Sequence, residues 1–209
     1  KKFCEYYIEC ATQADLLALW GVGAENKVVK SKCNKMTKYC RLEALEPYYF
    51  EKPWSEALRG KKVLVVHPFV ESIKKQYKIR EQLFINQNVL PQFASLTCIK
   101  AVQSFAGEKT KFDTWFDALN SMKEQISQND FDVAIIGAGA YSLPLAAYVK
   151  KIGKISIQMS GATQILFGIK GKRWENIPEV SKYFNEYWIK PSDSETPKYS
   201  KKVEGGSYW

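Results

Sequence analysis

The sequence has 209 residues, a formal net charge of +9 and 45% hydrophobic residues. This length fits a single α/β domain, and the apolar content, with 14% aromatic residues, excludes a disordered chain. No apolar run approaches the ~20 residues that a membrane-spanning helix needs. Because the chain begins at Lys1 without a methionine, we expect it to be the C-terminal part of a longer protein.

The five cysteines do not form a recognisable metal-binding pattern. No C-x-x-C spacing occurs, and the only histidine, His67, is far in sequence from Cys33 and Cys40. A zinc site is therefore disfavoured against buried free thiols in a reducing compartment. We expect a cytoplasmic location on this ground.

The first part of the chain predicts a helix and then a strand. Apolar residues at helical spacing predict a helix over Lys1–Gln13, and the apolar run Asp15–Trp20 predicts a buried strand. A helix remains open for the second run, because Leu and Ala favour it. Residues 26–53 show no sustained period, and residues 54–58 fit a short helical turn.

The middle of the chain alternates between strand and helix patterns. A strand is predicted at Val63–Val66, followed by an amphipathic helix over Val70–Phe84 and a second strand over Leu96–Val102. The residues Phe105–Thr110 are predicted to form a loop, and Trp115–Ile126 a helix. This alternation is typical of a parallel sheet covered by helices.

The central feature of the sequence is a strand, a glycine turn and a helix in succession. Val133–Ile136 predicts a strand buried on both faces, Gly137–Ala140 a tight turn, and residues 143–150 a helix. A strand over 154–159 and the small residues of Ser160–Gly168 then predict a second strand, turn and helix start. The prediction is a Rossmann-like α/β domain in three layers, with a mostly parallel sheet of about five or more strands. We expect one domain over 1–209, with residues 175–209 wrapping around it.

Polar and small residues follow each predicted strand, where a parallel sheet binds its ligands. They comprise Trp20, Gly21, Gly23 and Glu25 after the first strand, His67 after the second, Gln103 and Ser104 after the third, Gly137, Gly139 and Tyr141 after the fourth, and Ser160, Gly161, Thr163 and Gln164 after the last. Because these strand ends lie on one edge, we expect the residues to converge on a ligand.

Each of these signals has a structural alternative. Gly137-x-Gly139 lacks the third glycine of the dinucleotide fingerprint, so it fits either a diphosphate contact or a tight turn without a ligand. His67 fits a general base, a phosphate contact or a structural role. Lys172 and Arg173 fit phosphate neutralisation or simple solvation.

Several stretches resemble bacterial GT-D-type glycosyltransferase domains and their relatives in surface-polysaccharide loci. The stretches are Ala44–Tyr49 (ALEPYY), Gly60–Phe69 (GKKVLVVHPF), Lys100–Ser104 (KAVQS), Asp132–Tyr141 (DVAIIGAGAY), Ser160–Trp174 (SGATQILFGIKGKRW) and Val203–Trp209 (VEGGSYW). They extend over most of the chain, and the stretch from 160 to 174 is the most specific.

The resemblance implies a nucleotide-sugar donor and a glycan acceptor. It also implies a Mn or Mg ion, which the family holds with an Asp-x-Glu motif after an arginine and a glycine. This chain has no counterpart of that motif, since Glu25 follows a glycine without the arginine or the paired acid. No metal ligand or catalytic residue is therefore carried over from the family, and only the glycine loop and the Ser160–Gln164 loop match well enough to imply donor contacts.

Three functions follow from these patterns. The first is transfer of a sugar from a nucleotide diphosphate held by the amides of 137–141 and 161–164, with Lys172 or Arg173 offsetting its charge. Either His67 or an acid from a missing upstream segment would activate the acceptor hydroxyl. The second is a binding module with the same crevice and no turnover. Nucleic-acid binding ranks last, because the lysines are dispersed and no nucleic-acid motif appears.

Overall fold

The computed structural model describes residues 1–23, 25–33, 35–104, 109–202 and 204–209. Its strands are β1 (Leu16–Leu19), β2 (Lys38–Arg41), β3 (Lys62–His67), β4 (Ser95–Lys100), β5 (Val133–Ile136) and β6 (Ile155–Gln158). Its α-helices are α1 (Lys2–Ala11), α2 (Glu25–Lys32), α3 (Val70–Lys78), α4 (Trp115–Ser127), α5 (Ser142–Lys151), α6 (Ala162–Leu166), α7 (Lys172–Glu175) and α8 (Pro178–Ser181). The predicted loop over 105–110 lies partly outside the described residues.

The main sheet has four parallel strands in the order β4-β3-β5-β6. The α/β class and the parallel sheet are confirmed, but the expected five or more strands are not. The run Asp15–Trp20 does form β1, yet it pairs in parallel with β2 in a separate two-stranded sheet. β2 was not predicted, because its four residues have charged side chains at both ends, Lys38 and Arg41. The two residues between them, Tyr39 and Cys40, are too few to show a strand pattern.

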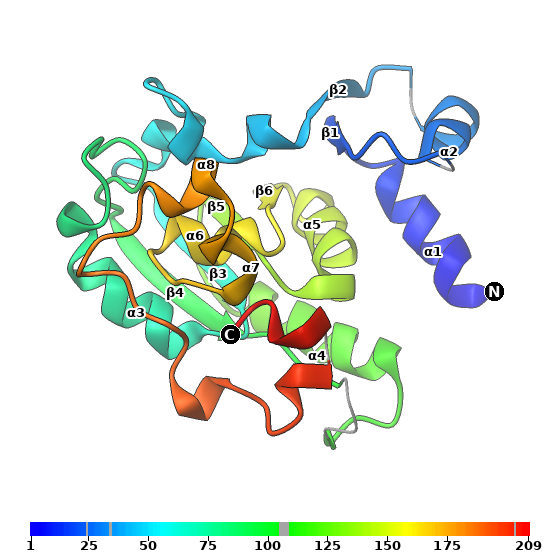
Figure 1. Cartoon of the computed structure of the whole chain (residues 1–209). Helices are drawn as coiled ribbons and strands as arrows, with labels where there is room; N and C mark the ends of the chain where they lie inside the picture. The colour runs from blue at the N-terminus through cyan, green and yellow to red at the C-terminus, as the bar shows by residue number, and fades with distance from the viewer. Residues whose placement is uncertain (24, 34, 105–108, 203) are drawn as a thin grey trace.

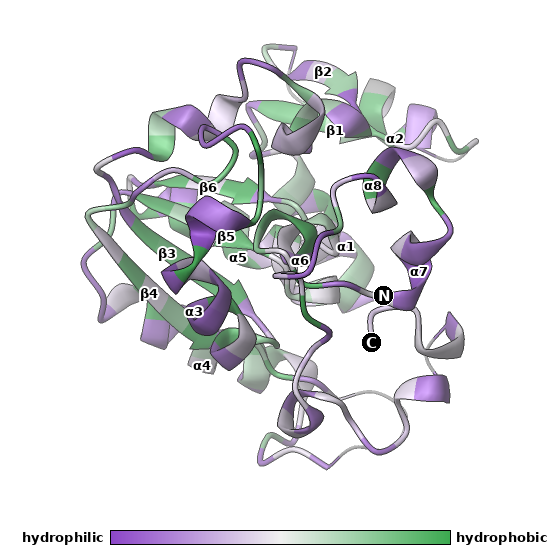
Figure 2. Ribbon diagram, turned by 60° about the vertical axis from the view of Figure 1, so that its left-hand side comes forward, coloured by the Kyte–Doolittle hydropathy of each residue, from purple (hydrophilic) through white to green (hydrophobic). Residues whose placement is uncertain are grey.

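The alternation of side chains along β3 and β5 builds the three layers. Val63, Val65 and Ile135 face a core formed with α3, α6 and the C-terminal segment. Leu64 and Ile136 face a second core, formed with α4 and α5. Because successive strand residues point to opposite faces, an unbroken apolar run is what a sheet covered on both sides requires. Figure 2 shows these strands as a mostly hydrophobic centre between the helices.

Local signals fix the ends of the main helices. Helix α4 begins with a capping box, in which the Thr114 hydroxyl accepts from the Asp117 amide and the Asp117 carboxylate accepts from the Thr114 amide. Helix α3 ends at Lys78, before a short 3₁₀ turn, and is therefore shorter than the predicted 70–84. Helix α6 follows β6 directly, as the small residues after 159 predicted.

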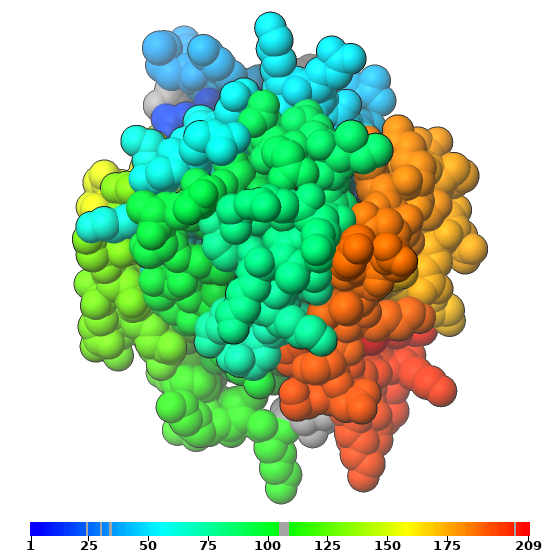
Figure 3. All heavy atoms as spheres, turned by 90° about the vertical axis from the view of Figure 1, so that its left-hand side faces the viewer, coloured from blue at the N-terminus to red at the C-terminus, as the bar shows by residue number. Residues whose placement is uncertain are grey.

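The N-terminal elements and the C-terminal segment pack on opposite sides of the main sheet. Figure 1 shows α1, α2, β1 and β2 grouped beside α5 and β6, and α1 contacts α5. The segment 175–209 lies along the α3 side, where Figure 3 shows it in orange to red. Val180 and Trp188 of this segment are buried, and the Trp188 indole donates to the Leu83 carbonyl at 3.0 Å. These contacts leave the carboxyl ends of β3, β5 and β6 between the two flanking parts.

Candidate functional site

The side on which successive strands are added to the sheet changes between β3 and β5. β4 lies on one side of β3, while β5 and β6 lie on the other, so the carboxyl ends of β3 and β5 form the switch point where open α/β sheets bind ligands. Gly137, at the end of β5, lies here. A Cβ atom added to it would lie 2.6 Å from the Ser160 carbonyl oxygen, 2.7 Å from His67 Cδ2 and 2.7 Å from Thr163 Oγ1. Four predicted site residues therefore meet, and protein atoms fill the space between them.

His67 is held in one tautomer at this point. Its Nδ1 accepts a hydrogen bond from the Phe69 amide at 3.0 Å, so the proton of the neutral ring is on Nε2. Burial lowers its pKa to about 3, and the ring is neutral at pH 7. In this arrangement His67 offers a hydrogen-bond donor, because the lone pair that a general base needs is already used.

Most of the amides predicted to hold a diphosphate are bonded within the chain. In the loop after β6, the amides of Ala162, Thr163 and Gln164 each donate to the carbonyl three residues before them. In the loop after β5, the Gly137 amide donates to the Val66 carbonyl and the Ala138 amide to the Ser142 hydroxyl. A phosphate at this edge therefore has to be held mainly by side chains.

Several buried polar atoms at the same edge have no hydrogen-bond partner. Thr163 Oγ1, Tyr141 OH and Trp115 Nε1 are three of the four such atoms in the described residues. The rings of Tyr141 and Trp115 stack at 5.0 Å between centroids, at the start of α4. Because folded proteins leave few buried polar atoms unpaired, their concentration at the carboxyl edge distinguishes this edge from the rest of the core.

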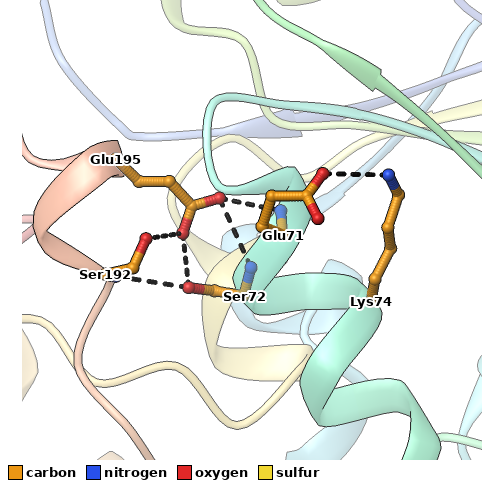
Figure 4. A network of polar contacts seen from close by, with 5 residues as sticks. All are labelled: Glu71, Ser72, Lys74, Ser192 and Glu195. Atoms are coloured by element: carbon orange, nitrogen blue, oxygen red, sulfur yellow. Dashed lines mark hydrogen bonds and ion pairs between the residues drawn. The ribbon is translucent and has the colours of Figure 1, made fainter.

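The N-terminus of α3 is occupied by a carboxylate from the C-terminal segment. Glu195 is 5% exposed, and its Oε1 accepts from the amides of Glu71 at 2.8 Å and Ser72 at 3.3 Å. Its Oε2 accepts from the hydroxyls of Ser72 and of Ser192 (Figure 4). Phe69, the residue before the helix, supplies no side-chain cap, so Glu195 accepts the hydrogen bonds of the free amides in its place. A negative charge at this position is also favoured by the helix dipole. This end of α3 is thus filled by the chain itself.

An open cleft lies beside this packed centre. It has a volume of about 640 Å³ and separates β1 and residues 42–49 from β6, α5 and the C-terminal elements. Its polar lining includes Gln13, Asp15, Glu43, Glu46, Lys150, Ser156, Gln158, Ser160 and Arg173, and its aromatic lining consists of Trp20, Tyr49, Trp174 and Tyr208. Ser160 has a φ of 48°, a left-handed conformation that costs a non-glycine residue energy and is common at functional sites.

Two of the three carboxylates in the cleft are in ion pairs. Asp15 pairs with Lys150 at 2.7 Å, and Glu43 pairs with Arg41 at 3.2 Å. Glu46 instead accepts a short hydrogen bond from the Tyr48 hydroxyl. Arg173 lies 3.8 Å from Glu204 and 3.4 Å from the Tyr208 hydroxyl, with its guanidinium over the Trp174 ring. The cleft therefore holds one cation between aromatic rings and one carboxylate that has no cationic partner within ion-pair distance among the residues that the structure describes.

Of the predicted donor-binding residues, Ser160, Gly161 and Arg173 line this cleft. Gln164 is buried, and its side-chain amide donates to the carbonyls of Ile169 and Tyr208. Gln103 lines a separate groove of about 350 Å³, which also contains Lys100 and Glu195.

Two further predicted residues lie at the surface. Lys172 is exposed and does not line the cleft. Gly139 is exposed, with a φ of 56° and open space around it. The predicted set is thus divided among the cleft, the packed centre, the second groove and the surface.

Glu46 is one of the residues of the cleft that the sequence analysis did not select. It lies in an extended conformation between two short 3₁₀ turns, Leu42–Leu45 and Pro47–Tyr49. The sequence of that region has no helical or strand period, so the position of Glu46 in the cleft could not be predicted from a pattern. The available signal was an acid next to a proline and two tyrosines.

Within the described ranges, no three His, Cys, Asp or Glu side chains come together in a way that can hold a metal ion. None of the helices in the described parts combines enough length with enough apolar character to span a bilayer. No protein-family model, curated protein or solved structure matched the chain.

Proposed function

We propose that this chain is a glycosyltransferase-like domain that binds a nucleotide-diphosphate sugar in the 640 Å³ cleft for transfer to a glycan acceptor. The observation that carries the proposal is the position of Arg173 among aromatic rings, next to Ser160 and Gly161 at the carboxyl end of β6. Ligands of α/β sheets bind beyond the carboxyl ends of the strands, so the cleft is where such a donor is expected.

The chemistry of the lining suits the parts of this ligand. A guanidinium binds phosphate oxygens through paired, charge-assisted hydrogen bonds. Tyr and Trp rings offer apolar faces to a base or a sugar, together with polar edges. The volume lies within the ~300–1,000 Å³ of small-molecule sites.

The test compares Arg173 with its neighbour Lys172. Isothermal titration with UDP-glucose, UDP-galactose, UDP-N-acetylglucosamine and GDP-mannose, each with and without manganese, measures donor binding. Arg173→Ala is expected to weaken the donor that binds by about 10–100-fold, since a hydrogen bond to a charged group contributes ~1.5–3 kcal/mol. Lys172→Ala removes an adjacent cation that does not line the cleft. The donor affinity of this variant should stay within about twofold of that of the parent chain.

Two results would contradict the proposal. One is the absence of binding for every nucleotide sugar at millimolar concentration. The other is an equal loss in the Lys172→Ala variant, which would indicate nonspecific attraction to a basic surface. Binding without any release or transfer of the sugar would favour the alternative of a non-catalytic binding module.

A further inference from the structure

We propose that Glu46 is the carboxylate that accepts the proton of the acceptor hydroxyl in this cleft. The inference rests on the proposed function and adds a residue to it. Glu46 lines the same cleft as Ser160 and Arg173, although it is more than 100 positions earlier in the chain. Among the three carboxylates of the cleft, it is the one without an ion pair in the described residues.

Tyr48 holds the Glu46 carboxylate in place. Its hydroxyl donates to Glu46 Oε2, while its ring is 3% exposed and contacts Tyr49, Phe84 and Tyr183. Because this buried phenol binds Oε2, the other carboxylate oxygen of Glu46, Oε1, does not take part in this hydrogen bond. Tyr48 therefore acts as a positioning residue, since it orients the carboxylate and does not itself line the cleft.

The surroundings of Glu46 make it a stronger base than a surface carboxylate. Burial, and to a lesser extent the Glu43 charge, raises the pKa of the Glu46 carboxyl above its usual range, against the opposing effects of hydrogen bonds from Tyr48 and Tyr49 and of the Arg173 charge. The guanidinium of Arg173 is close enough to act on this pKa, yet the described residues contain no ion pair between the two. An acid and a cation thus face the same space without neutralising each other directly.

This arrangement fits a displacement at the anomeric carbon of the donor. The acceptor oxygen forms a bond to that carbon while its proton moves to the Glu46 carboxylate. The bond from the anomeric carbon to the diphosphate breaks, and its electron pair leaves with the nucleotide diphosphate, whose added charge Arg173 offsets. Glu46 then returns the proton to solvent. Water can replace the acceptor, which gives donor hydrolysis.

The experiment measures donor binding and nucleotide diphosphate release on the same samples. The parent chain, Glu46→Gln, Glu46→Ala and Glu43→Gln are each incubated with the four nucleotide sugars, with and without manganese. Glu43→Gln is the matched control, because Glu43 lines the same cleft but is paired with Arg41. Release is followed from pH 5 to pH 9, and the Glu46→Ala samples are repeated with added sodium azide or formate.

Glu46→Gln is expected to lower the release rate by about 100-fold or more while donor affinity stays within about threefold, as removal of a general base should do. The loss of activity of the parent chain at acidic pH should be absent from this variant. Azide or formate should restore part of the release by Glu46→Ala, which a purely structural role would not permit. Glu43→Gln should keep the rate of the parent chain near neutral pH, and its acidic loss of activity should move only to a slightly lower pH, because the Glu43 charge raises the pKa of Glu46.

The outcomes separate this inference from the proposed function. If the parent chain binds and releases a donor and Glu46→Gln does so at the same rate, only the role of Glu46 is overturned. The same holds if the variant loses donor binding in parallel, or if azide and formate have no effect. If the parent chain binds a donor and never releases nucleotide diphosphate, the base role is overturned and binding remains. If no donor binds, both proposals are overturned.

Discussion

Strands β1 and β3 have similar apolar sequences and very different surroundings. Five of the six residues of β3 are buried, whereas no residue of β1 is. β3 lies between β4 and β5 under helices on both faces, while β1 pairs only with β2 and borders the open cleft. The number of neighbouring elements, more than the apolar run itself, therefore determines how much a strand contributes to stability.

The residues that follow these two strands differ in the same way. Trp20, after β1, is 65% exposed, while His67, after β3, is 3% exposed. The rigid centre of the sheet thus positions the carboxyl edge, and the N-terminal part supplies an accessible wall of the cleft. The two regions can be compared by equal substitutions placed in each.

The largest difference is expected from Leu64→Ala and Leu17→Ala. Leu64 is fully buried in β3, so its truncation should lower the free energy of unfolding by about 2–5 kcal/mol through lost burial and a residual cavity. Leu17 is half-buried in β1, and the same truncation should cost about 1 kcal/mol. Urea unfolding of both variants measures the two values. Equal losses would show that the N-terminal part is as tightly packed as the sheet.

Acid provides the next comparison, since the only histidine of the sequence is in the sheet region. The folded pKa of His67, about 3, is below the unfolded value near 6.5, so between these values the unfolded chain binds a proton that the folded chain does not. The contribution of neutral His67 to the free energy of unfolding is therefore present above pH 6.5 and is lost as the pH falls towards 3. Between pH 7 and pH 5 this amounts to about 2 kcal/mol.

His67→Asn keeps an acceptor for the Phe69 amide and removes the titration. Urea unfolding at pH 7, 6 and 5 should show that the parent chain loses about 2 kcal/mol more than this variant. Parallel curves for the two proteins would mean that the ring is protonated equally in both states. The comparison uses the change in the free energy of unfolding with pH, so a loss of stability that is the same at every pH does not affect it.

The smallest of these effects is expected at the two carboxylates that bind backbone amides. Glu195→Gln removes a buried charge that accepts three hydrogen bonds from α3 and one from Ser192, and should cost about 1 kcal/mol. Glu25 accepts from the Trp20 and Gly21 amides near the surface, and Glu25→Gln should change stability by less than about 0.5 kcal/mol. Urea unfolding of both variants measures the two changes in the free energy of unfolding, and thermal unfolding provides a second measurement. A larger loss at Glu25 would reverse the ranking of the two regions.

The parts of the fold that could be predicted are those with a strong local pattern. The apolar runs at 63–66 and 133–136 predicted strands buried on both faces, and β3 and β5 are such strands. The region of β2 and Glu46 had no such pattern, because a short partner strand and a chain of 3₁₀ turns leave no period in the sequence.

The candidate site was only partly predictable for a related reason. The small residue at Gly137 correctly indicated a close approach, but the approaching atoms belong to Ser160, His67 and Thr163 of the same chain. A glycine signals that space is needed and not what fills it. Arg173 could be recognised as a candidate cation from its sequence neighbours, whereas its place in the cleft depends on contacts with Tyr208 and Glu204.

The sequence by itself determined the α/β class, the main strands and helices and the small-residue turns, because side-chain periodicity and backbone preference act within a few residues. Only the tertiary structure decided that β1 pairs with β2 outside the main sheet, that Glu195 fills the N-terminus of α3, and that Glu46 faces the same cleft as Arg173. Each of these depends on residues distant in the chain that compete for the same hydrogen bonds and buried space, and folding decides that competition for the whole molecule at once.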